Sequence, residues 1–205
     1  AKTDETPFVP KGYEVAHDQF RLPIEPLPKK CEAEKGPELH LSNTDESVIV
    51  SSKKVEFNFN KSEGVVKSYK VDGYQYIAEG FGLQPNFWRP PNDNDYGNGG
   101  PLREQVWKTM SHNFKVEKAH TFIHDNVCHI NIVYSLVNNN KYEVVYRIYG
   151  SGVVKVQANY VHSKETEANV LPDMPRIGLR FRVPKELNNV HYFGRGPEEN
   201  YLDRR

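Results

Sequence analysis

Apolar side chains alternate with polar ones from residue 48 onward, the pattern of β-strands with one buried face. Residues 55–59 alternate strictly, and a turn at 61–64 leads into a second alternating segment. The Asp72-Gly73 pair then predicts a tight hairpin, because both residue types are common in turns that need positive φ. We therefore expect this part of the chain to form consecutive antiparallel strands.

A second series of strands is predicted after residue 114. Turns rich in Asn, Asp or Gly divide it at 124–126, 138–140 and 150–152. The expected strands are 114–122, 127–137 with Ile130, Ile132 and Tyr134 on one face, 142–149, 154–160 and 177–183.

One helix is predicted, at 101–114, directly after a glycine-rich segment. Pro101 suits the first helical position, where its missing N–H costs nothing. Leu102, Val106 and Met110 are spaced by four and would share one face of the helix. Many strands, one short helix and short turns together predict an all-β fold, a large antiparallel β-sandwich.

The N-terminal part of the chain differs from the rest because it is rich in Pro, Lys and Glu. Only residues 13–22 alternate as a strand would, and prolines then recur at 23–28. Such a sequence is typical of an extended linker between folded units. We expect residues 1–40 to be the end of a preceding domain with its linker, and residues 41–205 to form the sandwich.

The balance of charge excludes some classes of partner. The 205 residues include 27 Lys plus Arg and 27 Asp plus Glu, so no net field would attract nucleic acid or an anionic membrane. No apolar run approaches the ~20 residues that span a bilayer, and the first residues lack the apolar region of a signal peptide, so we expect a soluble chain. Cys31 and Cys128 form neither a CxxC pair nor a disulfide framework, which leaves the cell compartment open.

An unusual polar segment interrupts the strands at 87–100. Two aromatic residues and an arginine precede two prolines, and alternating Asp and Asn then lead into glycines. Prolines lower the entropy of the unfolded chain, Asx side chains cap N–H groups, and glycines permit positive φ. The segment is interpreted either as a loop that holds polar groups on a defined surface or as a well-capped connection.

The acidic part of this loop does not fit a calcium site. Asp93, Asp95 and Glu104 stand at positions 1, 3 and 12 of a twelve-residue loop. Position 5 is Gly97, where a ligand is needed, and position 6 is Asn98, where the motif needs Gly. The eight histidines form none of the usual zinc patterns. We therefore predict no metal site in this chain.

A second shaped loop is predicted at 193–204, which combines two glycines, a proline and several charges. Gly194 and Gly196 lack the third glycine and the following helix of a nucleotide-binding motif. Glu198 and Glu199 are a poor glycosidase pair, because neighbours in an extended segment point apart whereas catalytic carboxyls face each other across ~5–9.5 Å. No nucleophile motif occurs either, so we predict no catalytic residue in this chain.

Three motifs together resemble the C-terminal domain of the large bacterial β-galactosidases of glycoside hydrolase family 2. They are Phe-Trp-Arg-Pro-Pro-Asn-Asp-Asn-Asp-Tyr-Gly at 87–97, Pro-Arg-Ile-Gly-Leu at 175–179 and Gly-x-Gly-Pro-Glu-x-Asn-Tyr-x-Asp-Arg at 194–204. Their order and approximate spacing match as well. The motif positions interpreted as structural are Trp88, Arg89, Arg176, Gly194, Gly196, Glu198, Asn200, Tyr201, Asp203 and Arg204.

The resemblance implies a fold and a domain organisation. It implies that residues 41–205 are the first part of a supersandwich similar to galactose mutarotase, truncated at its end. Residues 14–23 resemble the end of that family's second immunoglobulin-like domain and the start of its linker.

The resemblance also implies a place near the substrate. In relatives, the loop after the Asp-Asn-Asp motif borders the active-site cleft. The catalytic glutamates and the magnesium ligands of that family lie in a central barrel, so magnesium, with sodium as a further candidate, is expected in the full-length enzyme and not in this chain. The candidates for the pocket wall in this chain are Asp93, Asn94, Asp95 and Gly97.

Three functions remain open at this point. The first is a non-catalytic module of a β-galactosidase, inactive alone, with the rest of a homo-oligomeric enzyme and β-galactosides such as lactose as partners. The second is a free-standing carbohydrate-binding sandwich in which Trp88, Trp107 or Tyr96 stacks on sugar rings. The third is a mutarotase-like enzyme, which needs a histidine and a glutamate that converge in a cleft. We expect the first.

Overall fold

The computed structural model of the chain describes residues 4, 6–14, 35–163 and 170–191. The chain divides into two compact units, residues 1–31 with 188–205 and residues 32–187. In the first unit, an antiparallel bridge between Thr6 and Val9 closes a short turn. Of the strand expected at 13–22, only Tyr13 and Glu14 belong to the described residues.

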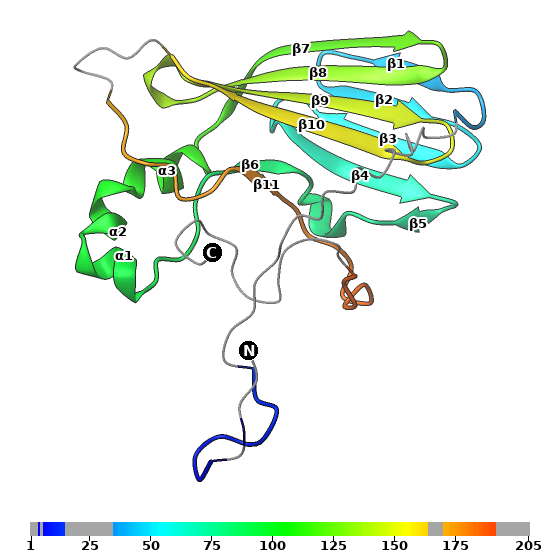
Figure 1. The fold of residues 1–205 in the computed structure, drawn as a ribbon. Coiled ribbons are helices and arrows are strands. Elements are labelled where there is room, and N and C mark those ends of the chain that lie inside the picture. The colour runs from blue at the N-terminus through cyan, green and yellow to red at the C-terminus, as the bar shows by residue number, and fades with distance from the viewer. Residues whose placement is uncertain (1–3, 5, 15–34, 164–169, 192–205) are drawn as a thin grey trace, which may run out of the picture. The chain divides into compact units, whose positions relative to one another are not determined.

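One sheet of the second unit has five antiparallel strands in the order β1-β2-β3-β4-β5 (Figure 1). On β3, Val55, Phe57 and Phe59 are buried between more exposed polar residues, which confirms the predicted alternation. The predicted hairpin is confirmed too, since Asp72 and Gly73 join β4 to β5 with φ of 50° and 81°. The strands are β1 (His40–Asn43), β2 (Ser47–Ser51), β3 (Val55–Asn60), β4 (Val65–Val71) and β5 (Tyr74–Gln75).

The other sheet has four antiparallel strands in the order β10-β9-β8-β7 (Figure 1). Asp125 and Asn126, with φ of 53° and 57°, form the predicted turn between β7 and β8. Ile130, Ile132 and Tyr134 of β8 are all buried, so they share one face as predicted. The strands are β7 (Lys115–His124), β8 (Val127–Ser135), β9 (Lys141–Tyr149) and β10 (Val154–Val161).

The two sheets pack face to face around one core, which confirms the predicted all-β antiparallel sandwich. The ring of Phe57 on β3 lies 5.8 Å, centroid to centroid, from that of Tyr146 on β9. A hydrogen bond also joins the sheets, because the buried hydroxyl of Tyr134 donates to the carbonyl oxygen of Gly64 at 2.8 Å. The core thus combines apolar contacts with a satisfied polar group.

A small third sheet and two 3₁₀ helices connect these parts. The strand predicted at 177–183 is wrong in its extent, since only three of its residues pair with a neighbouring strand. Ile177, Phe181 and Val183 are 58%, 52% and 40% exposed, so their alternation is not matched by burial that would support a longer strand. The elements are β6 (Gln84–Asn86), β11 (Gly178–Arg180), η1 (Ala78–Gly80) and η2 (Val137–Asn139).

The single helix predicted at 101–114 is divided into two, and a further short helix precedes it. Glu104, with φ of −93° and ψ of 3°, separates the two parts. Because of this break, Leu102 is 83% exposed while Met110 is buried, so they do not share a face as predicted. No helix in the described ranges is long and apolar enough to cross a membrane. The helices are α1 (Asp93–Gly97), α2 (Gly100–Arg103) and α3 (Gln105–Met110).

Candidate functional site

The segment at 87–97 is anchored in the core at its first residue. Phe87 is completely buried, and its ring centroid lies 6.2 Å from that of Trp107 and 5.1 Å from that of Tyr142, both edge to face. Its backbone N–H donates to Oγ of Ser111 at 2.8 Å. Ser111 is buried as well, and its hydroxyl donates to the carbonyl oxygen of Trp107 at 2.8 Å. These contacts fix the point at which the segment leaves the core.

Arg89 and Asp95 form the central contact of this segment. Nη1 of the arginine donates to Oδ2 of the carboxylate at 2.7 Å, and Nη2 donates to Oδ1 at 3.0 Å. Such two-pronged pairs are stronger and more directional than single contacts. The two side chains are 18% and 17% exposed, so solvent screens them less than it screens a surface pair. The ion pair therefore joins the two ends of residues 89–95.

Asn92 and Asp95 start α1 as a reciprocal cap. Oδ1 of Asn92 accepts the backbone N–H of Asp95 at 3.1 Å, and Oδ2 of Asp95 accepts that of Asn92 at 2.7 Å. The backbone N–H of Asn92 first, and then Arg89, lower the pKa of Asp95. The prediction of a loop without a helix is therefore wrong here, and the spacing of Asn92 and Asp95 is the signal that could have identified the helix start.

The four residues predicted to form a pocket wall lie together on α1. Asp93, Asn94 and Gly97 are exposed, whereas Asp95 is turned back into the ion pair. Tyr96 lies among them and is 65% exposed. The helix therefore presents two polar side chains and one aromatic ring to solvent, while Asp95 acts as their internal anchor.

The other predicted residues have different surroundings. Trp88 is partly buried, and Nζ of Lys108 lies 5.9 Å from its ring centroid. Trp107 is 2% exposed and donates its indole N–H to the carbonyl oxygen of Pro172 at 3.1 Å, so its prediction as an exposed sugar platform is wrong. Arg176 is exposed. The predicted residues outside the described ranges are Gly194, Gly196, Glu198, Asn200, Tyr201, Asp203 and Arg204.

Sequence reasoning misses Ser111 and Arg180, which support the anchored segment. Nη2 of Arg180 donates to the carbonyl oxygen of Ser111 at 3.3 Å, and its guanidinium lies 5.5 Å from the ring centroid of Phe81. Burial, followed by the neighbouring Arg182, lowers the pKa of Arg180. A serine at a helix end and an arginine at the end of a short strand give no signal of their contact, because 69 positions separate them in the chain.

Comparison with known proteins places the chain in a family. The family described as beta galactosidase small chain matches residues 51–205. The chain belongs to this family. Similar proteins include beta-galactosidases of Priestia megaterium (30% identical over 204 residues, 98% of this chain and 19% of the relative), Clostridium acetobutylicum (26% over 201 residues, 97% and 21%) and Streptococcus thermophilus (27% over 203 residues, 98% and 19%).

This member of the small-chain family spans about a fifth of the length of the curated relatives it matches. The family match includes the segment at 87–97 and also the motif at 194–204, which lies outside the described residues. All three motifs that carry the resemblance, at 87–97, 175–179 and 194–204, therefore fall within the region that the family shares.

The small-chain residues that the structure describes do not gather ligands for a metal ion. Within these ranges, no three His, Cys, Asp or Glu side chains lie close enough to hold one. Asp95 is engaged with Arg89, and Glu104 pairs with Arg103 at 3.2 Å. The described residues thus do not fit the magnesium and sodium of the resemblance, which stay expectations for the full-length enzyme.

Proposed function

We propose that this chain is a non-catalytic module of a family 2 β-galactosidase that hydrolyses terminal β-D-galactosides such as lactose. In this proposal, other parts of the enzyme carry the catalytic carboxylates, and the small-chain module forms part of the wall of the sugar pocket and stabilises a homo-oligomeric assembly. Membership of the small-chain family supports it, as does a length of about a fifth of relatives that are named beta-galactosidase.

The observation that carries the pocket-wall role is the bidentate pair of Arg89 and Asp95. A short helix of five residues is not stable alone, because helix nucleation is costly. The pair and the cap with Asn92 hold α1 in one conformation, and they thereby position the backbone that carries the exposed Asp93 and Asn94. Fixed polar groups beside a reacting sugar improve the rate because small displacements are costly.

The test is Asp95→Ala in the full-length enzyme that contains this chain. The substitution removes no group that does chemistry, but it breaks the ion pair with Arg89 and the reciprocal cap of α1. We expect kcat/KM to fall about ten- to a hundredfold, equivalent to ~1.4–2.7 kcal/mol, with changes in both kcat and KM. Lys70→Ala is the matched control, since it breaks the exposed pair of Lys70 and Glu56, 2.8 Å apart, on the first sheet.

Kinetics and melting temperature are measured on the same preparations. If α1 merely caps the sandwich, Asp95→Ala lowers the melting temperature while the folded enzyme keeps wild-type kcat/KM. That outcome would contradict the pocket-wall role. Reduced kcat/KM in the folded Asp95→Ala enzyme, with normal kinetics in Lys70→Ala, is the result the proposal requires.

A further inference from the structure

The outer face of the second sheet carries a row of side chains in register across all four strands. Phe122 of β7 lies opposite His129 of β8, which lies opposite Arg147 of β9, which lies opposite Lys155 of β10. Directly opposite residues project on the same side of a sheet. Since the neighbours of His129 on β8 are buried in the core, these four side chains, the cross-strand row, project outward.

In the cross-strand row, the positively charged Arg147 and Lys155 lie side by side without a carboxylate between them. Like charges directly opposite each other destabilise a sheet, and Arg147 lies directly opposite Lys155. Among the described residues, Nη1 of Arg147 reaches the amide oxygen of Gln157 at 3.4 Å, and Nζ of Lys155 lies 5.4 Å from the ring centroid of Tyr149, but neither side chain contacts a carboxylate.

Some other cations of the same unit have carboxylate partners within the chain. Lys35 pairs with Asp125 at 2.5 Å, and Lys141 pairs with Glu117 at 2.8 Å on the second sheet itself. The chain as a whole has as many acidic as basic residues, so carboxylates are not scarce. Among the described residues, the contacts with Gln157 and Tyr149 offset the repulsion in the cross-strand row only in part, because neither supplies a negative charge.

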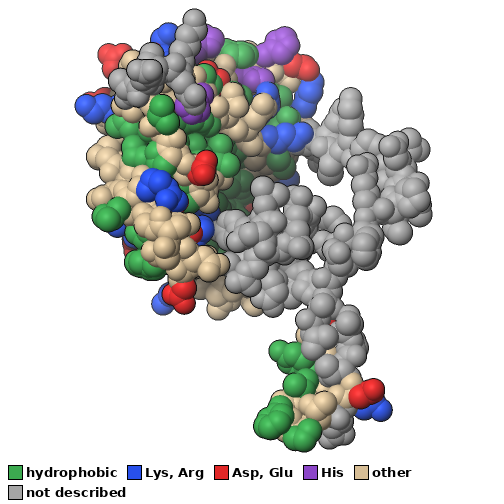
Figure 2. Space-filling model, turned by 60° about the vertical axis from the view of Figure 1, so that its left-hand side comes forward, with side chains coloured by type: hydrophobic (Ala, Val, Ile, Leu, Met, Phe, Trp, Pro, Cys, Tyr) green, Lys and Arg blue, Asp and Glu red, His purple; other side chains and the backbone are tan. Residues whose placement is uncertain are grey.

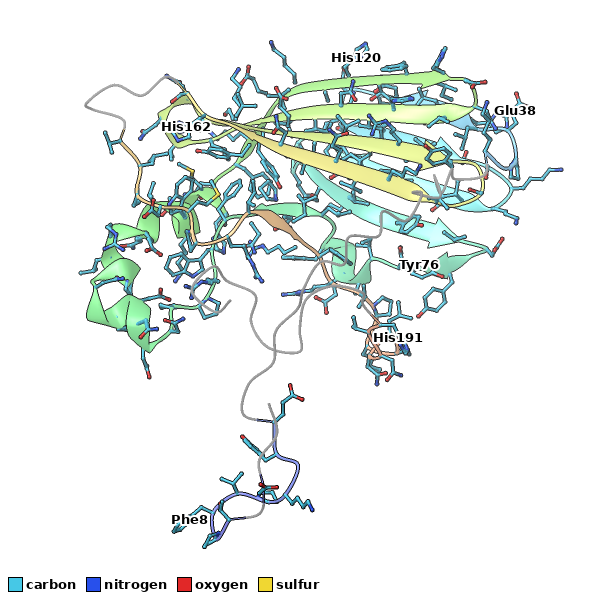
Figure 3. The ribbon with its side chains drawn as sticks, in the orientation of Figure 1. Phe8, Glu38, Tyr76, His120, His162 and His191 are labelled. Carbon is cyan, nitrogen blue, oxygen red and sulfur yellow. The ribbon has the colours of Figure 1, made fainter. Side chains whose placement is uncertain are left out.

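Aromatic rings extend the cross-strand row toward β7. The rings of Phe122 and His129 are stacked, with centroids 4.8 Å apart and planes 2° from parallel. His120 stands beside them on the outer side of β7, and its ring centroid lies 5.4 Å from that of Phe122 (Figure 3). Histidine side chains gather at the top of the molecule in Figure 2, where β7 and β8 lie in Figure 1. Burial first, and then Arg147 and His124, lower the pKa of His129, so the ring adds a flat surface at neutral pH more than a charge.

The shape of this face favours a protein surface over a small ligand. Small molecules bind in concave sites, whereas the outer side of a four-stranded sheet is broad. A protein surface with carboxylates would supply the missing anions, and aromatic side chains with arginine are typical of such interfaces. About four-fifths of the length of the matched relatives lies outside this chain, which provides a covalently attached source of that surface.

We propose that the outer face of β7–β10 docks onto a carboxylate-bearing surface of the other domains of the complete enzyme, where Arg147 and Lys155 pair with Asp or Glu side chains. This rests on the proposed function, because it requires the chain to be one module of a larger β-galactosidase. The contact would offset the repulsion between Arg147 and Lys155 and bury the stacked rings of Phe122 and His129.

Zero-length cross-linking of the full-length enzyme tests the contact directly. A water-soluble carbodiimide joins lysine amines to carboxylates in contact, and mass spectrometry identifies the joined peptides. We expect Lys155 to be joined to an Asp or Glu outside residues 1–205, and Lys70 to Glu56 as an internal control. A Lys155 that stays unmodified, or that is joined only within residues 1–205 of the same or a second copy, would overturn the proposal.

Lys155→Glu in the full-length enzyme gives a second test, because the change in Tm has a different sign for a docked face and for an undocked face. Within the chain, the change places a carboxylate opposite Arg147, so an undocked face predicts an unchanged or higher Tm. Docking predicts a Tm lower by about 3 °C or more, because a carboxylate then faces the carboxylates of the other domains. Lys53→Glu is the matched control, because this exposed lysine lies between β2 and β3 of the other sheet, and it should leave the Tm unchanged.

The two proposals can fail separately. A Lys155 without external cross-links, together with reduced kcat/KM in Asp95→Ala, overturns the docking face alone. Wild-type kcat/KM in folded Asp95→Ala, together with external cross-links at Lys155, overturns the pocket wall alone.

Discussion

The carboxylate of Asp95 accepts two guanidinium N–H groups and one backbone N–H within 3.0 Å. Hydrogen bonds to charged groups contribute about 1.5–3 kcal/mol, and more is lost if a partner is left unpaired. The side chain of Asp95 therefore contributes to the order of the 87–97 segment, together with the anchored Phe87.

This coupling predicts a pH dependence for the stability of the chain. The pKa of Asp95 is lower in the folded state than the ~3.9 of an unfolded aspartate. Its contribution is therefore fully present above about pH 4–5 and is lost as the pH falls through the lower folded pKa. Denaturant titrations should give the wild type a higher free energy of unfolding than Asp95→Asn at pH 7. This difference in free energy should become smaller toward pH 3. A gap that stays constant over this range would contradict the assignment.

At the scale of elements, α3 holds the 87–97 segment through one buried hydroxyl. Ser111→Ala removes the acceptor for the N–H of Phe87 and leaves that donor buried and unpaired. We expect a loss of about 1–3 kcal/mol in the free energy of unfolding, measured by chemical denaturation. Thr109→Ala on the same helix removes an exposed hydroxyl that donates to the carbonyl oxygen of Gln105, and should stay within about 0.5 kcal/mol of wild type. If both substitutions lowered the free energy of unfolding equally, the hydrogen bond from Phe87 to Ser111 would have no stabilising effect of its own.

The elements also show how far the sequence could predict the fold. The strand at Val55–Asn60 and the hairpin at Asp72 were predictable because alternation and turn chemistry act between near neighbours. The sequence could not predict that the helix divides at Glu104 or that Trp107 is buried, since both depend on which side chains the sandwich can accommodate. Likewise, the motif identified Asp95 as part of the candidate site, but Ser111 and Arg180 join that site only through contacts between distant parts of the chain.

For the whole molecule, a net charge of zero gives no hint of how charge is distributed. Some of the described cations have a carboxylate partner, among them Lys35, Lys70 and Lys141, while the two cations of the cross-strand row have none among the described residues. Charge balance predicts no general attraction to polyanions, but it says nothing about the charge of one sheet face. The register of four strands was needed to bring Arg147 and Lys155 together.

The same distribution of charge predicts that divalent cations leave the stability of this chain unchanged. The carboxylates of the acidic segment are already engaged, Asp95 with Arg89 and Glu104 with Arg103, so Asp93 would stand alone as a ligand. An ion at 1 mM that bound with a Kd of 1 µM would add ~4 kcal/mol to folding, or about 8–16 °C in Tm for a chain of this size. We expect 1 mM magnesium or calcium to shift the Tm by less than about 2 °C relative to sodium chloride of equal ionic strength. A rise of about 8 °C that Asp93→Ala abolishes would establish a metal site on α1 and refute this expectation.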